Sequence, residues 1–379
     1  MTVVTSGYFE GAERLLAIAR ESRYSMGVKY DFRVAVLGAT GMVGQRFVSL
    51  LENQPWFHVT EVAASPKSAG QRYADAVASR WVLPSPMPKA AGELVVRDAS
   101  DVEAIASRVD FVFCAVDMSK DETRALEDAY ARAETPVVSN CGAHRATPDV
   151  PMMVPELNAD HAELVVAQRR RRGTQRGFVA VKPNCSLQSY VPAIHPLLDL
   201  GVTKVAVCTY QALSGAGKTH ATYPEMADSI IPFIGGEEEK SEQEPHKIWG
   251  RVEDGRVVPA RAPVISAQCV RVPVSDGHLA AVSMALATRV SKEEIVGRWR
   301  AFEGKPQKLG LPSAPKPFLI YHDEDDRPQT RLDRDAGNGM AISLGRLRAD
   351  TILDWRFVGL SHNTVRGAAG GVILSAELL

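Results

Sequence analysis

The sequence has almost no net charge, and this shortage narrows its possible partners. Its 44 lysines and arginines nearly balance 45 aspartates and glutamates, so the formal net charge is -1 at pH 7. Because the charges balance, the protein as a whole has no positive electrostatic potential that would attract nucleic acid or an anionic membrane surface. We therefore expect a small-molecule partner, no nucleic acid and no membrane.

Cysteine is also scarce. The five cysteines are odd in number, widely spaced and without a Cys-x-x-Cys pair, which gives no sign of a disulfide framework or a metal site. We expect free thiols, no metal and a cytoplasmic location. Apolar runs approaching the roughly 20 residues that cross a bilayer are absent, and acidic residues near the N-terminus do not fit a signal peptide.

What remains is a chain of 379 residues with 45% hydrophobic and 23% charged residues, a balance typical of a globular protein with two packed domains. Residues 1–32 stand apart as an N-terminal extension, in which residues 11–20 have the pattern of a short amphipathic helix. Met26 is an alternative start.

A glycine turn follows the first strong strand pattern, Arg33–Gly38, and leads into a helical pattern at 45–52. Glycines at 38, 41 and 44 permit a tight turn, close approach to a pyrophosphate and close helix packing. Strand, turn and helix in this order predict a dinucleotide site, with an ordinary tight turn as the alternative. The candidate cofactor residues at this turn are Gly38, Thr40, Gly41, Met42 and Val43.

The next strand pattern, residues 59–65, ends without the acid that binds the ribose 2'-hydroxyl of NAD. Ser65, Lys67 and Ser68 follow instead, and hydroxyls beside a cation suit a 2'-phosphate. The sequence therefore favours NADP over NAD, unless these residues form only a solvated turn.

Strand and helix patterns continue to alternate. Residues 110–116 and 136–140 are typical of buried strands, and the segment between them is helical through Arg132. This alternation predicts a doubly wound parallel sheet. The basic run 168–177 is expected to be a solvated loop.

Cys185 stands in the polar run Lys-Pro-Asn-Cys-Ser (182–186), ahead of a segment that can open a helix. A helix N-terminus favours the thiolate, the nucleophilic form of cysteine. Cys185 is therefore the candidate nucleophile, whereas the other cysteines are interpreted as packing residues.

Several motifs occur in order. They are Gly-Ala-Thr-Gly-Met-Val-Gly at 38–44, Pro-Asn-Cys-Ser at 183–186, Gln-Ala-Leu-Ser-Gly-Ala-Gly at 211–217, Arg-Val-Pro-Val-Ser-Asp-Gly-His at 271–278, and Ser-His-Asn-Thr-Val-Arg-Gly-Ala-Ala-Gly-Gly at 361–371. Over residues 33–379 the chain resembles aspartate-semialdehyde dehydrogenase of the archaeal and fungal-type branch.

The resemblance implies an α/β fold like that of glyceraldehyde-3-phosphate dehydrogenase. A Rossmann-type NADP-binding domain would comprise 33–181 plus 357–379, and an α+β catalytic and dimerisation domain would comprise 182–356. The family also implies a homodimer or homotetramer. Its final helix would pack back against the nucleotide domain.

The implied reaction is the reductive dephosphorylation of L-aspartyl 4-phosphate to L-aspartate 4-semialdehyde with NADPH, in lysine, threonine, methionine and isoleucine biosynthesis. Cys185 would form a thioester, and His278 would act as the acid and base that takes the thiol proton and later returns one. Arg271 would hold the substrate α-carboxylate, which requires a loop at 275–277 to bring it near His278.

Further roles rest on the same resemblance, with turns and surface salt bridges as the alternative interpretation. Glu244 would engage the substrate ammonium, although the run 236–248 alone is typical of a solvated charged helix. The other implied substrate residues are Gln211, Asn184, Lys247, Arg145 and Asn140. The implied nicotinamide-side residues are Ser214, Gly215 and Asn363.

Two other functions stay open. An acyl-CoA reductase of the malonyl-CoA type would need the same thiol, imidazole and arginine, and Leu187 departs from the threonine usual after Cys-Ser. A nucleotide-sensing protein would keep the fold without turnover, although intact Cys185, Arg271 and His278 argue against it.

Overall fold

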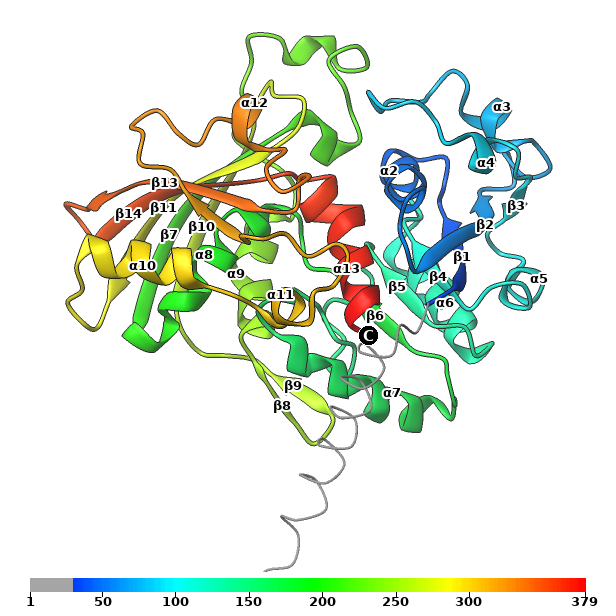
Figure 1. Ribbon diagram of the computed structural model, residues 1–379, viewed down its shortest axis with the longest axis horizontal. Helices are drawn as coiled ribbons and strands as arrows, with labels where there is room; N and C mark the ends of the chain where they lie inside the picture. The colour runs from blue at the N-terminus through cyan, green and yellow to red at the C-terminus, as the bar shows by residue number, and fades with distance from the viewer. Residues whose placement is uncertain (1–29) are drawn as a thin grey trace, which may run out of the picture.

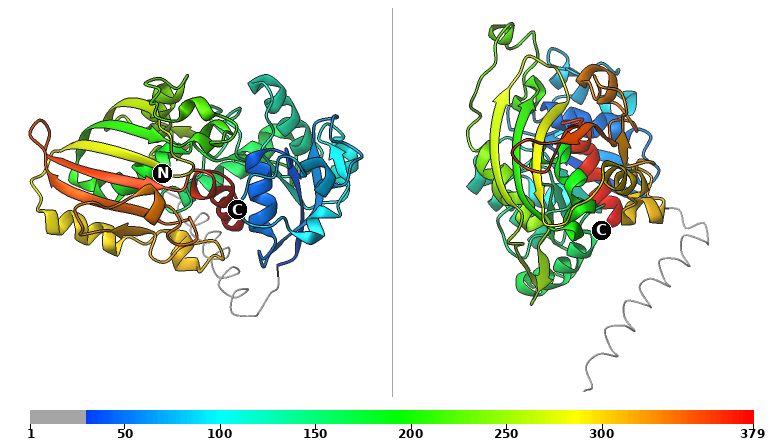
Figure 2. Two further views of the ribbon diagram at one scale, coloured as in Figure 1. Left: turned by 90° about the horizontal axis from the view of Figure 1, so that it is seen from above. Right: turned by 90° about the vertical axis from the view of Figure 1, so that its left-hand side faces the viewer.

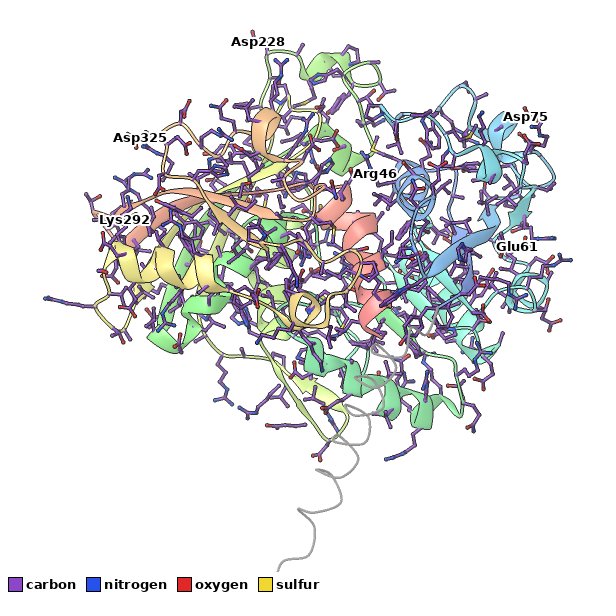
Figure 3. All side chains as sticks on the ribbon, viewed as in Figure 1. Arg46, Glu61, Asp75, Asp228, Lys292 and Asp325 are labelled. Carbon is purple, nitrogen blue, oxygen red and sulfur yellow. The ribbon has the colours of Figure 1, made fainter. Side chains whose placement is uncertain are left out.

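The computed structural model describes residues 30–379, so the helix expected at 11–20 lies outside the described residues. Two sheets stand side by side, each with its own helices (Figure 1). Within residues 30–379, no helix is long and apolar enough to cross a membrane. Charged side chains lie on the outside of both halves, as Asp75 does near the first sheet and Lys292 and Asp325 near the second (Figure 3).

The first sheet has six parallel strands in the order β3-β2-β1-β4-β5-β6. This order is typical of dinucleotide-binding folds and reverses direction between β1 and β4. The doubly wound parallel sheet is therefore confirmed. The strands are β1 (Phe32–Leu37), β2 (Phe57–Ala64), β3 (Val96–Asp98), β4 (Phe111–Cys114), β5 (Val137–Ser139) and β6 (Val179–Val181).

Both faces of this sheet are buried, as parallel sheets require. In β1, Val34 and Val36 pack with Phe47 of α2, whereas Ala35 and Leu37 belong to the cluster that contains Tyr130 of α6. The helices of this half are α2 (Met42–Leu51), α3 (Tyr73–Val77), α4 (Lys89–Gly92), α5 (Val102–Ala106), α6 (Lys120–Arg132), η1 (Ala159–Glu163) and α7 (Leu164–Arg172).

The prediction of a loop at 168–177 is wrong for residues 168–172. Residues 168–172 form the end of α7, and Gly173 ends the helix at a φ of 71°. Arg172 is nearly buried and pairs with Asp128 at 2.6 Å. The four arginines are stable there because the negative end of the helix dipole attracts cations.

The second sheet is mixed and has the order β10-β7-β11-β14-β13-β12. β7 pairs in parallel with β10 and antiparallel with β11, so it joins the two strands that carry Arg271 and His278. The strands are β7 (Val202–Gln211), β10 (Val264–Arg271), β11 (His278–Leu286), β12 (Leu319–Tyr321), β13 (Ile342–Ala349) and β14 (Trp355–Ser361), with a separate hairpin of β8 (Arg251–Glu253) and β9 (Arg256–Val258).

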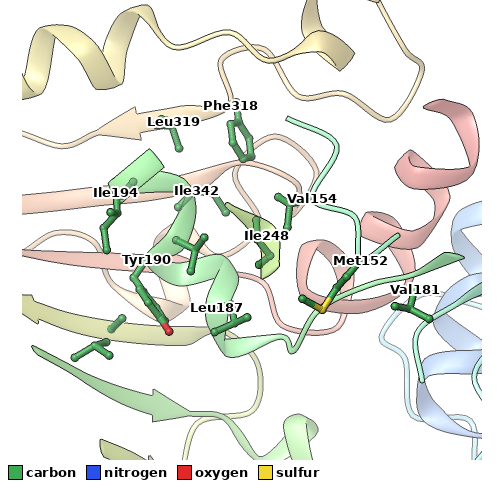
Figure 4. Packing of buried hydrophobic residues seen from close by; sticks show 14 of the residues in the cluster. Met152, Val154, Val181, Leu187, Tyr190, Ile194, Ile248, Phe318, Leu319 and Ile342 are labelled. Carbon is green, nitrogen blue, oxygen red and sulfur yellow. The ribbon is translucent and has the colours of Figure 1, made fainter. Parts of the chain in front are cut away.

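Short helices and α9 surround this sheet. They are η2 (Ser186–Ser189), α8 (Val191–Ile194), η3 (His195–Leu200), η4 (Leu213–Ala216), η5 (Pro224–Met226), α9 (Glu237–Ile248), α10 (Lys292–Ala301), α11 (Lys305–Leu309) and α12 (Thr330–Asp333). Leu187 and Tyr190, just after Cys185, are fully buried in the cluster shown in Figure 4. The cysteine segment is thus anchored in the core.

The chain ends on the first sheet. The π-helix η6 (Val365–Ala369) and α13 (Gly370–Leu378) place Ala369, Val372 and Ile373 in the cluster beneath α2, and α13 lies between the two halves (Figure 2). The expected return of the last helix to the nucleotide half is confirmed. β14 still belongs to the second sheet, so by sheet membership the return comes after Ser361, later than the predicted residue 357.

Candidate active site

The chain brings Cys185 and His278 together from separate elements. Cys185 follows β6 and precedes η2, whereas His278 is the first residue of β11. The Cys185 Sγ atom lies 3.3 Å from Nε2 of His278. A thiol and an imidazole at this distance form a nucleophile with an adjacent proton-transfer group.

The other ring nitrogen of His278 fixes its tautomer. The Ala212 amide donates to Nδ1 over 3.1 Å, and an amide N–H can only donate. Nδ1 therefore keeps its lone pair, and the neutral ring carries its proton on Nε2, facing the sulfur. Burial, followed by the charge of Arg271, lowers the pKa of His278 well below its ordinary value, so the ring is neutral at pH 7.

The thiolate expected from a helix N-terminus is wrong for the unliganded protein. Cys185 precedes only the short 3-10 turn η2, which carries little dipole, and burial raises the pKa of the Cys185 thiol. The nearby charges of Lys182, Arg145 and Arg271 act in the opposite direction. A thiol with a raised pKa therefore lies beside the guanidinium groups of Arg145 and Arg271, which suits an anionic ligand.

Arg271 joins this site through the shared strand β7. Its backbone is paired with Gln211 of β7, and its Nη1 donates to Ala212 O over 2.7 Å. A Cβ on Gly215 would lie 2.8 Å from Arg271 Nη1 and 2.9 Å from His278 Cε1. Arg271 and His278 thus converge on Gly215, and the loop expected at 275–277 is present, with Gly277 at a φ of 98°.

Glu237 is a central residue that sequence reasoning missed. Its carboxylate accepts from Asn184 Nδ2 at 2.9 and 3.0 Å, from Gln211 Nε2 at 3.1 Å, and from Lys240 Nζ at 2.8 Å. It is also the nearby acid whose charge raises the pKa of Cys185. A sequence signal existed, because the buried stripe of α9 at Pro245 and Ser241 reaches residue 237 one turn earlier.

Glu244 accepts hydrogen bonds from Arg145 and from the cysteine segment. Its Oε1 accepts from Arg145 Nη1 at 3.2 Å, and its Oε2 accepts from the backbone amide of Asn184 at 2.6 Å. Arg145 also donates to the backbone oxygens of Lys182 and Asn140, at 2.9 and 3.2 Å. These residues form one network around the cysteine segment. Their direct binding of substrate stays a prediction.

Lys247 is directed away from that network. Its buried ammonium donates to the carbonyl oxygens of Arg145, Thr147 and Val150 at 2.8, 2.7 and 2.9 Å. All three protons are used, and burial lowers its pKa to about 8. A phosphate contact would require these bonds to break, so the geometry favours a role in holding the Arg145 segment.

The glycine turn has the shape that a dinucleotide needs. Gly38 has a φ of 79°, and its Cβ would lie 2.3 Å from Ala115 O; a Cβ on Gly44 would lie 2.1 Å from Gly38 O. Helix α2 begins at Met42, and no side chain caps its N-terminus. The backbone N–H groups of its first turn, beside Thr40 and Val43, can therefore bind an anion.

At the end of β2, Ser65 and Lys67 are exposed. Ser68 is buried and accepts a hydrogen bond from Arg80 Nη2 over 3.0 Å. The structure thus adds Arg80, which sequence reasoning missed, as a second cation at the predicted 2'-phosphate position.

Asn363 connects the two halves beside the histidine. Its Nδ2 donates to Ser214 Oγ over 2.8 Å, and its Oδ1 accepts from the Gly277 amide over 2.8 Å. The chain segment after β14 is therefore tied to the turns that flank His278. Its contact with nicotinamide stays a prediction.

Comparisons with known proteins show the family. Residues 33–165 match the family model of the semialdehyde dehydrogenase NAD binding domain, and residues 194–366 match that of the semialdehyde dehydrogenase dimerisation domain. The aspartate-semialdehyde dehydrogenase of Archaeoglobus fulgidus is 44% identical over 92% of this chain and 98% of its own length.

Eukaryotic relatives are similar. The enzyme of Schizosaccharomyces pombe is 41% identical over 91% of this chain and 97% of its own. The crystal structure of the Candida albicans enzyme with NADP has a TM-score of 0.82 and 38% identity, covering 92% of this chain and 98% of that one. The chain belongs to the aspartate-semialdehyde dehydrogenase family of oxidoreductases, as its sequence motifs predict.

Proposed function

We propose that this protein catalyses the NADPH-dependent reductive dephosphorylation of L-aspartyl 4-phosphate to L-aspartate 4-semialdehyde through a thioester on Cys185. The observation that carries the proposal is the Cys185 Sγ to His278 Nε2 contact of 3.3 Å beside the guanidinium of Arg271. The product would serve lysine, threonine, methionine and isoleucine biosynthesis.

In the first half-reaction, the Cys185 sulfur forms a bond to the acyl carbon, and the carbon–oxygen bond to phosphate breaks with its electron pair leaving on phosphate. The thiol proton leaves with the phosphate or to water, because Nε2 of His278 already holds a proton. In this role His278 donates a hydrogen bond to the sulfur. Proton abstraction by His278 would require its contact with Ala212 to break.

In the second half-reaction, bound NADPH supplies a hydride to the thioester carbonyl carbon. Nε2 of His278 lies on the sulfur side, and its N–H can donate a hydrogen bond to the resulting oxyanion. The oxyanion then collapses to the aldehyde, the carbon–sulfur bond breaks with its electron pair on sulfur, and the Cys185 thiolate takes a proton from water. One acyl phosphate, one NADPH and one proton give one aldehyde, one NADP and one phosphate.

The charges around Cys185 fit an amino acid that carries two anionic ends. Arg271 would bind the α-carboxylate, and Arg145 the phosphate. For the ammonium, we favour Glu237 over Glu244, because Glu237 shares hydrogen bonds with Asn184 and Gln211 beside the sulfur. Lys240, paired with Glu237 and partly exposed, is the better placed phosphate cation than Lys247.

We further propose NADP as the cofactor, supported by the glycine turn, the absence of an acid after β2, and the NADP in the Candida albicans structure. Lys67→Ala should raise the Kd for NADPH about tenfold and leave the Kd for NADH nearly unchanged, since one charge-assisted contact is lost. Equal weakening of both would remove the proposed contact.

We also propose a homodimer or homotetramer. The match of residues 194–366 to a dimerisation domain supports it. A cytoplasmic location stays a prediction that the five free thiols support.

The test is reduction of NADP with aspartate semialdehyde and inorganic phosphate, followed by NADPH absorbance. Reduction should require phosphate and be lost in Cys185→Ala but not in Cys208→Ala, a matched thiol outside the site. Oxidation of NADPH by malonyl-CoA instead would support the acyl-CoA reductase. No turnover with either substrate, in protein that still binds NADPH, would support the nucleotide sensor.

A further inference from the structure

A group of side chains of the types that ligate metal ions lies outside the catalytic site. Cys114 ends β4, Cys141 follows β5, and Glu127 lies on α6. One sulfur or oxygen atom from each lies within 4.8 Å of the other two. The two sulfurs are 3.9 Å apart although their residues are 27 positions apart in sequence, which is why the cysteine spacing gave no metal signal.

The sulfur separation suits a tetrahedral thiophilic cation. Zinc–sulfur bonds of about 2.3 Å place two thiolate ligands about 3.8 Å apart in a tetrahedral site. Parallel pairing of β4 with β5 brings Cys114 opposite Ser139, just before Cys141, so the backbone holds both sulfurs on one edge of the sheet. Little movement is needed to close the site on a cation.

Glu127 supplies the independent observation. It is fully buried, with one carboxylate oxygen bonded to Ser139 Oγ and with the Cys114 thiol as a hydrogen-bonding neighbour of the carboxyl group. The carboxyl group therefore faces the two sulfurs and not the solvent, and a buried acid in contact with a thiol is a ligand set that a thiophilic cation can take up. Ser139 Oγ also accepts from the Cys141 amide at 2.9 Å, so the same hydroxyl orients two of the three ligands.

We propose that Cys114, Cys141 and Glu127 form a site for Zn²⁺ or a similar thiophilic divalent cation, with a fourth position open to water beside the partly exposed Cys141. Burial raises the pKa of Glu127, and the contact with Cys141 followed by burial raises that of Cys114. Binding would therefore exchange protons for the metal. The bound cation would tie β4, β5 and α6 together just before the segment that carries Arg145.

The experiment is a titration of the full chain with Co²⁺, which gives intense thiolate charge-transfer and tetrahedral d–d absorption. It uses a Cys185→Ser background, because Cys185 and His278 could bind cobalt themselves. One equivalent should produce the tetrahedral spectrum, and one equivalent of Zn²⁺ should abolish it. Cys114→Ser and Cys141→Ser should each weaken binding at least 100-fold, Glu127→Gln about tenfold, and the matched Cys208→Ser not at all.

Absence of a thiolate band at tens of micromolar Co²⁺ would overturn the proposal, and so would a band that survives in Cys141→Ser. Cys141 is the partly exposed member, so its replacement leaves the core intact. This readout does not depend on turnover. It therefore stands or falls separately from the proposed function.

Discussion

The Ala212 amide donates to Nδ1 of His278, and the opposite nitrogen of the ring faces Cys185. A backbone donor at Nδ1 disfavours an imidazolium, because both groups would then present protons to each other. Cys185 and His278 therefore rest as a neutral pair rather than as thiolate and imidazolium. This differs from the activated pair that a helix N-terminus predicts.

The neutral pair has a measurable pH dependence. Burial raises the pKa of Cys185 and lowers that of His278, so thiolate forms only as pH rises through the raised thiol pKa. Alkylation of the unliganded protein by iodoacetamide at Cys185, followed by peptide mass spectrometry, should rise steadily on the alkaline side. A fast plateau between about pH 5 and 7 would instead reveal an ion pair.

Lys182 should assist the thiolate. Its side chain is 2% exposed and donates to Pro183 O at 2.9 Å, and its charge lowers the pKa of Cys185. Lys182→Met should slow alkylation of Cys185 about tenfold at pH 7, since an opposite charge is lost. Lys204→Met, at an exposed position of β7, is the matched control and should leave the rate unchanged.

The same substitution should stabilise the fold. Burial lowers the pKa of Lys182 to about 7, below its unfolded value, so between about pH 7 and 10 the unfolded chain binds more protons and stability rises with pH. Lys182→Met removes this buried charge and should gain about 1–3 kcal/mol in urea unfolding at pH 7. A gain as large at pH 10 would contradict the burial argument.

Much of this site follows from sequence, and the rest fails for physical reasons. Cys185, Arg271 and His278 could be predicted as candidates because each stands in one of the ordered motifs. Arg271 ends β10, His278 begins β11, and Cys185 follows β6. Glu237 was missed because α9 holds five glutamates that the sequence alone does not distinguish by burial. The hydrogen bond from the Tyr190 hydroxyl to the Ser241 carbonyl helps to set which face of α9 is buried. The prediction of a thiolate at Cys185 was wrong because burial raises the pKa of the thiol more than the dipole of a short turn can lower it.

Glu237 and Glu244 can be separated by experiment. Glu237→Gln should raise KM for aspartate semialdehyde at least tenfold, because a charge-assisted contact to the ammonium is lost. It should also speed alkylation of Cys185, since the charge of Glu237 raises that thiol's pKa. Glu244→Gln should chiefly raise KM for phosphate through its partner Arg145; the opposite pattern would restore Glu244 as the ammonium ligand.

Gly215 should be intolerant of even a methyl group. Its Cβ would meet Arg271 Nη1 at 2.8 Å and His278 Cε1 at 2.9 Å, so Gly215→Ala must displace one or both groups. A displacement of this size should lower kcat/KM about 100-fold, while the melting temperature stays nearly constant because Gly215 is exposed. Gly297→Ala in α10, where a Cβ meets nothing within 4 Å, is the control and should leave kcat/KM unchanged. Near-normal turnover in Gly215→Ala would mean that Arg271 and His278 do not converge there during the reaction.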